Sequence, residues 1–187
     1  MKPLFPTPAG LEPQLIGLEG IRLVVFDIYG TLIISAAGDI SLVSEVESRR
    51  GMQEALEVLG LENGPAEVEE ALLLYRKTIG QIQERLRKEG TEFPEVEIRE
   101  VWQAVAGYPE LEMSRLEEAA LVYECFVNPC WEMPGASNVL ALLARNQLPL
   151  GIISNAQFYT DAVVSGVSGI SLADGFFEQD LCVFSYR

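Results

Sequence analysis

The chain has 187 residues, 49% apolar and 22% charged, which is typical of one globular domain or of a core domain that carries an insertion. Its net charge of -15 argues against binding to nucleic acid or to an anionic membrane surface, since both require Lys and Arg. The absence of histidine excludes Ser-His-Asp and Cys-His catalysis and histidine-rich metal sites.

Residues 1–20 contain four prolines and no long apolar core, so we predict an extended surface segment and not a signal peptide. No apolar run in the sequence is long enough to span a bilayer. The three cysteines, Cys125, Cys130 and Cys182, form no C-x-x-C pair, and we interpret them as ordinary reduced thiols. These features favour a cytoplasmic protein.

The first predicted strand runs from Ile21 to Phe26 and ends at the carboxylate of Asp27. Its apolar, β-branched residues are typical of a strand buried on both faces inside a parallel sheet. Gly30 then allows a sharp turn. In open α/β sheets, ligands bind at the carboxyl ends of the strands, so Asp27 is placed like a nucleophile.

A short strand and turn are predicted over 33–40, and the composition changes after them. From 41 to 129 glutamate is abundant, and every aspartate of the chain lies outside this stretch. Glu favours helix interiors, whereas Asp prefers caps and turns. Apolar residues recur at helical spacing, with breaks at 60–65, 90–94 and 107–109. We predict four or five helices that form a separate bundle with a solvated, charged surface.

After residue 129 the α/β pattern returns. A helix is expected from Pro134 to Arg145, then a buried strand over 147–153 that ends at Ser154 and Asn155. A helix over about 157–165 and a third strand over 181–184 follow. The predicted fold is therefore an α/β core made of 1–40 and 130–187, with an α-helical domain inserted at 41–129.

Two motifs on these strands resemble those of the haloacid dehalogenase superfamily. Asp27-Ile28-Tyr29-Gly30-Thr31-Leu32 resembles its first motif, in which an aspartate nucleophile precedes x-x-Gly-Thr-Leu/Val. Ile152-Ile153-Ser154-Asn155 resembles the second, an apolar strand that ends in Ser or Thr. The resemblance implies a Rossmann-like parallel sheet, with the helical insertion as a cap that closes over the site.

The resemblance also implies roles for individual residues. Asp27 would attack the substrate and form a covalent intermediate, positioned by Thr31 and Ser154. Gly30 and Ser154 would contact a small anionic substrate, and Asn155 would donate hydrogen bonds to the leaving group or to the anionic group. Arg76 is the cap residue best suited to a substrate carboxylate, although a plain surface charge is the alternative reading.

Tyr29 departs from the pattern of phosphatases in this superfamily, which usually have a second Asp there as general acid and base. Tyrosine is a poor base at neutral pH, with an ordinary pKa of about 10. Halide leaves carbon without a proton, so the motif is similar to that of 2-haloacid dehalogenases, which need no cofactor. A phosphatase is the alternative; it would use Mg²⁺ near Asp27 and Tyr29.

The lysine and the distal acidic residues of the family have no counterpart before Arg187. We therefore expect a fragment of a longer enzyme with little turnover of its own, or a non-catalytic module that binds an anion or a partner. Without a further strand, the first strand would be an exposed apolar edge. A homodimer or strand exchange would cover this edge.

Overall fold

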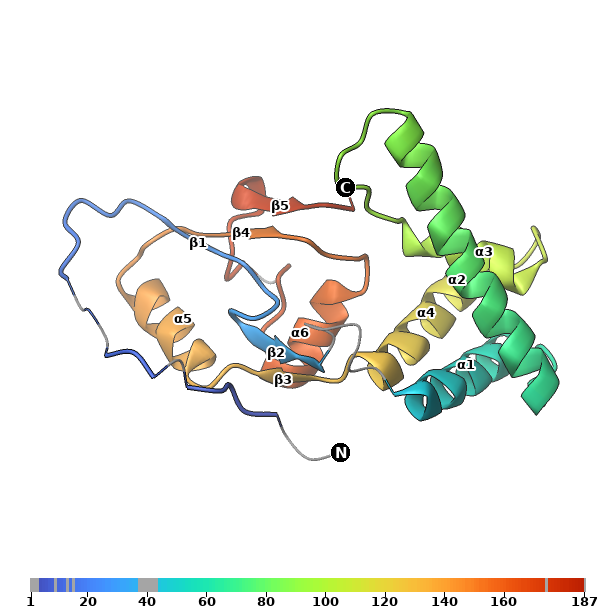
Figure 1. Cartoon of the computed structure of the whole chain (residues 1–187). Helices are drawn as coiled ribbons and strands as arrows, with labels where there is room; N and C mark the ends of the chain where they lie inside the picture. The colour runs from blue at the N-terminus through green and yellow to red at the C-terminus, as the bar shows by residue number, and fades with distance from the viewer. Residues whose placement is uncertain are drawn as a thin grey trace. The chain divides into compact units, whose positions relative to one another are not determined.

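The computed structural model describes residues 4–8, 10–12, 14, 16–36, 44–173 and 175–186. The chain divides into two compact units (Figure 1). The α/β unit contains the described parts of Met1–Gly38 and Cys130–Ser185, and the helical unit those of Asp39–Pro129. The predicted α/β class with an inserted helical bundle is confirmed. The end of the strand and turn predicted over 33–40, from residue 37 on, and Arg187 lie outside the described residues.

The main sheet has three parallel strands in the order β1-β4-β5. These are β1 (Val24–Phe26), β4 (Leu150–Ser154) and β5 (Cys182–Phe184). Phe26 lies beside Ile152, and Ser154 lies beside Phe184. Because the strands are parallel, the polar residues that follow each of them gather at one end of the sheet.

A second, two-stranded sheet was not predicted in full. β2 (Ile33–Ser35) confirms the short strand expected after the first motif, and it pairs antiparallel with β3 (Cys130–Glu132). β3 escaped prediction because three residues are too few to show a strand period. This small sheet joins two segments of the α/β unit: β2, which follows the turn after Asp27, and β3, which precedes α5.

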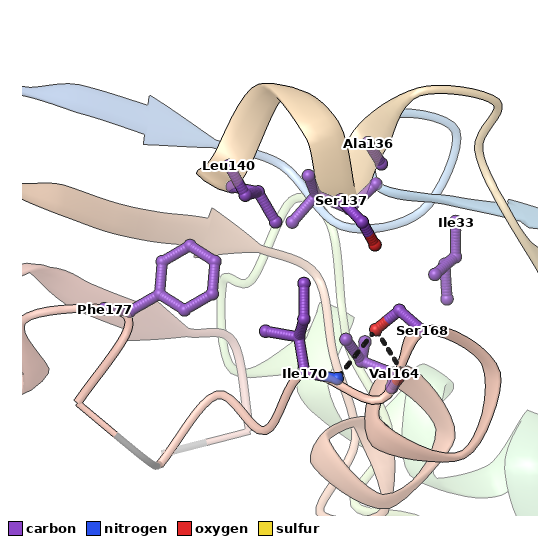
Figure 2. A pocket seen from close by; sticks show the side chains of 9 residues that line it. Ile33, Ala136, Ser137, Leu140, Val164, Ser168, Ile170 and Phe177 are labelled. Carbon is purple, nitrogen blue, oxygen red and sulfur yellow. Dashed lines mark hydrogen bonds between the residues drawn. The ribbon is translucent and has the colours of Figure 1, made fainter. Parts of the chain in front are cut away.

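Two helices of the α/β unit, α5 (Ala136–Arg145) and α6 (Thr160–Ser168), follow β3 and β4. α6 begins later than the predicted residue 157 and ends at Ser168, with Gly169 as its C-cap. Side chains from both helices and from β2 line a small cavity (Figure 2), whose volume is about 10 Å³. This volume is at the lower limit for a single water molecule, and Ser168 Oγ in its lining is already bound to the Val164 carbonyl and the Ile170 N–H. The cavity is a small packing gap and not a ligand site.

The sequence predicted that the first strand is buried on both faces, and the structure shows that this prediction is wrong. β1 is an edge strand, and Val25 is 41% exposed. The same face of the sheet also exposes Ile153 and Val183, at 60% and 59%. The opposite face, with Ile152 and Phe184, is buried. The described elements thus cover one face of the sheet, and the expected exposed apolar edge is present.

We expect this edge to drive association of the protein. An apolar edge strand with free backbone groups pairs readily with another chain, and a lysine on it opposes such pairing. Val25→Lys should therefore reduce the concentration-dependent rise in mass measured by light scattering. Val139→Lys is the matched control, because Val139 is 48% exposed but lies on α5. Equal association of both variants and the unsubstituted protein would contradict a role for the edge.

The described residues of the helical unit form four helices, in agreement with the predicted bundle and its breaks. They are α1 (Glu45–Leu59), α2 (Pro65–Lys88), α3 (Ile98–Ala106) and α4 (Met113–Val127). The Ser44 hydroxyl caps α1 by accepting a hydrogen bond from the Glu47 N–H at 3.1 Å. No helix in the described part of the chain combines the length and apolar composition of a membrane span.

An aromatic cluster of Tyr75, Trp102 and Tyr123 joins α2, α3 and α4. The ring centroids lie 5.0–5.6 Å apart, in tilted or edge-on arrangements that aromatic pairs favour. Burial raises the pKa of Tyr75 well above its ordinary value, and it also raises the pKa of Tyr123. Both phenols therefore stay neutral at physiological pH, and the cluster is the core of the helical unit.

Candidate functional site

The turn after β1 presents Asp27 to solvent. Three successive N–H groups, from Thr31 to Ile33, donate to the Ile28 carbonyl at 2.8–3.2 Å, and the Gly30 N–H donates to the Ile33 carbonyl. Gly30 has a φ of 83°, which residues with a Cβ rarely adopt. The turn buries Ile28 completely and leaves Asp27 exposed at the end of the strand.

The carboxylate of Asp27 is held by the hydroxyl of Ser154. Ser154 Oγ donates to Asp27 Oδ1 at 2.7 Å and accepts a longer bond of 3.4 Å from the Ile28 N–H. Ser154 is only 6% exposed, and it ends the strand that lies beside β1. The two residues are 127 positions apart in the sequence, and the parallel pairing of β1 with β4 brings them together.

The second carboxylate oxygen of Asp27 is left open. Among the described residues, Asp27 forms no ion pair, and its only hydrogen bond is the one from Ser154 to Oδ1. An ordinary structural aspartate would pair with a cation or cap several N–H groups. Oδ2 can instead approach an electrophile while Ser154 holds Oδ1 in place.

The phenol of Tyr29 is bound to the start of α6. Its hydroxyl lies 3.1 Å from Thr160 Oγ1, which also accepts a hydrogen bond of 3.0 Å from the Gln157 N–H. Thr160 is almost completely buried, at 1% exposure. The hydrogen bond with Thr160 Oγ1 thus ties the phenol of Tyr29 to the start of α6, and its role as a lining residue of the site stays a prediction.

The other residues predicted for the site differ in where they lie. Gly30 and Thr31 are in the turn, but the Thr31 hydroxyl makes no hydrogen bond to any described residue. Asn155 follows Ser154 and is exposed, and its side chain likewise has no described partner. Arg76 is an exposed residue of α2 in the helical unit, near Tyr123. Its role toward a substrate stays a prediction.

Sequence reasoning missed two hydroxyls at this end of the sheet. Thr160 could have been found as a Thr near the start of a helix, the position at which hydroxyl residues commonly bind backbone N–H groups. Ser185 directly follows β5, so the rule that identified Asp27 and Ser154 also applied to it. Ser185 Oγ accepts a hydrogen bond from the Ala156 N–H at 3.0 Å.

A magnesium site near Asp27 and Tyr29 stays a prediction, for which the described residues supply the Asp27 carboxylate. Mg²⁺ requires octahedral oxygen ligands, commonly one or two carboxylates together with substrate phosphate and water. Here Asp27 is the single carboxylate of the site, and the Tyr29 phenol is bound to Thr160. The described part of the chain contains no group of three acidic, Cys or His side chains placed to hold a metal. No step below uses a metal.

Comparisons of the chain with protein-family models and with curated protein sequences found no match.

Proposed function

We propose that the protein is a hydrolase with an aspartate nucleophile, similar to the 2-haloacid dehalogenases. The observation that carries the proposal is the exposed Asp27 carboxylate with Ser154 Oγ 2.7 Å from Oδ1. The two motifs that resemble those of the haloacid dehalogenase superfamily contribute these two residues. A helical insertion between the two motifs agrees with the cap of that superfamily.

The reaction would proceed in two steps. Asp27 Oδ2 attacks the carbon that bears the halogen, the carbon–halogen bond breaks, and halide leaves with the bonding electrons. The product is an ester between Asp27 and the substrate. Water then attacks the carbonyl carbon of this ester, which restores the Asp27 carboxylate and releases the 2-hydroxy acid and a proton. Asn155 would donate hydrogen bonds to the halide or to the substrate carboxylate.

The environment of Tyr29 favours halide over an alkoxide as the leaving group. An alkoxide needs a proton as it departs, which requires a general acid near the nucleophile. The phenol of Tyr29 is bound to Thr160, and phenols ionise only near pH 10. Halide needs no proton, so its departure requires no general acid beside Asp27.

A phosphatase acting on a small phosphorylated metabolite is the alternative within the same superfamily. Asp27 would then attack phosphorus, and the best substrates would have leaving groups that are stable as anions. A non-catalytic module that binds an anion is the alternative from another class. It is favoured by the absence of a cation paired with Asp27 among the described residues.

A direct assay distinguishes these functions. The 187-residue chain is incubated with 2-chloropropionate or with p-nitrophenyl phosphate, each with and without Mg²⁺. Since the chain is expected to have little turnover of its own, we expect slow chloride release that is independent of Mg²⁺. Phosphate release that requires Mg²⁺ would favour the phosphatase. Binding of either anion by calorimetry, with no product and no covalent adduct by intact mass spectrometry, would favour the non-catalytic module.

A further inference from the structure

Ser185 holds the loop that carries Ser154 and Asn155. Its N–H donates to the Ser154 carbonyl at 3.3 Å. Its hydroxyl accepts from the Ala156 N–H at 3.0 Å and reaches the Ala156 carbonyl at 3.4 Å. A residue that follows β5 thus binds the backbone on both sides of Asn155, which follows β4.

This arrangement connects Ser185 to Asp27 through Ser154. The strand pairing places Ser154 beside Phe184, and the Ser185 N–H fixes the Ser154 carbonyl. Ser154 then directs its hydroxyl to Asp27 Oδ1. If the loop moved, the Ser154 hydroxyl and the Asn155 amide would move with it.

We propose that Ser185 is a positioning residue for the reaction of Asp27, an inference that rests on the proposed function. A hydroxyl is suited to this place because it can accept from the Ala156 N–H and donate to the Ala156 carbonyl. An alanine would make neither bond, whereas a threonine keeps the hydroxyl. Catalytic geometry is sensitive to small displacements, so loss of these bonds should slow the attack of Asp27.

The test compares Ser185→Ala, Ser185→Thr and the control Ser171→Ala. Ser171 Oγ accepts a hydrogen bond of 3.1 Å from the Ala173 N–H, so its loss removes a similar bond after α6. With 2-chloropropionate, Ser185→Ala should lower kcat by roughly 10- to 100-fold with little change in KM. Ser185→Thr should restore most of kcat, and Ser171→Ala should leave it unchanged. An equal loss of kcat in Ser171→Ala would overturn the proposal.

Amide hydrogen exchange measured by NMR provides a second test that needs no turnover. Ser185→Ala should accelerate exchange at Ala156, which loses its acceptor directly, and at Ile28, whose N–H donates to Ser154 Oγ. Ser171→Ala should change neither. Faster exchange at Ala156 with no change at Ile28 would overturn the positioning role. Absence of turnover and adduct in the unsubstituted protein would instead contradict the proposed function.

Discussion

Replacing Asp27 by Asn is expected to abolish the covalent adduct and the release of product, a loss of roughly 10⁴-fold or more. A neutral amide is a far weaker nucleophile than a carboxylate, yet it has nearly the same shape. Its oxygen can still accept the hydrogen bond that Ser154 Oγ donates at 2.7 Å. The site should therefore keep its geometry while it loses its reactive group.

Intact mass spectrometry after a brief incubation with 2-chloropropionate is the sensitive measurement, because a slowly hydrolysed ester accumulates even when turnover is low. Peptide mapping should place the added mass on Asp27. Asp180→Asn is the matched control, since Asp180 is an exposed carboxylate of the same unit and lies in the turn before β5. Adduct formation in Asp27→Asn would show that another residue is the nucleophile.

The sequence was sufficient to predict which strands end in polar side chains that meet at one edge of the sheet. Asp27 and Ser154 follow apolar runs long enough to recognise, and parallel strands bring their carboxyl ends together. Sequence alone could not show that the Ser154 hydroxyl binds Asp27 directly or that Tyr29 turns toward Thr160. Those contacts depend on side-chain rotamers and on the register of β1 against β4.

The burial of the strands was predicted less well, for a physical reason. Val25, Ile153 and Val183 are apolar, β-branched residues, the kind that is buried in parallel sheets with helices on both faces. Their exposure depends on which elements cover each face, and this is a property of the assembled layers. β3 also depends on the assembled structure, because it is recognisable as a strand only through its pairing with β2.

In the helical unit, periodicity predicted the helices but not their contacts. The packing of Tyr75 against Trp102 and Tyr123 could not be derived from spacing within one helix. These side chains come from three helices that are separated by the breaks near residues 90 and 108. The helical unit therefore depends on side chains far apart in the sequence.

Trp102 is the residue of this cluster whose loss should destabilise the protein most. Its side chain is completely buried, and Trp102→Ala should lower the free energy of unfolding by about 3–5 kcal/mol through lost burial and a new cavity. Urea unfolding followed by the helical circular dichroism signal measures this as a lower midpoint. Trp131→Ala, at a half-buried position of β3 in the α/β unit, should affect that signal less.

Trp102→Phe separates the packing of the ring from its polar N–H group. The buried Trp102 Nε1 has no hydrogen-bond partner among the described residues. A buried donor without a partner costs about 1–3 kcal/mol, and phenylalanine removes that cost while it keeps an aromatic ring in the cluster. We therefore expect Trp102→Phe to retain most of the stability that Trp102→Ala loses. Unfolding of both variants at the same urea concentration would contradict this expectation.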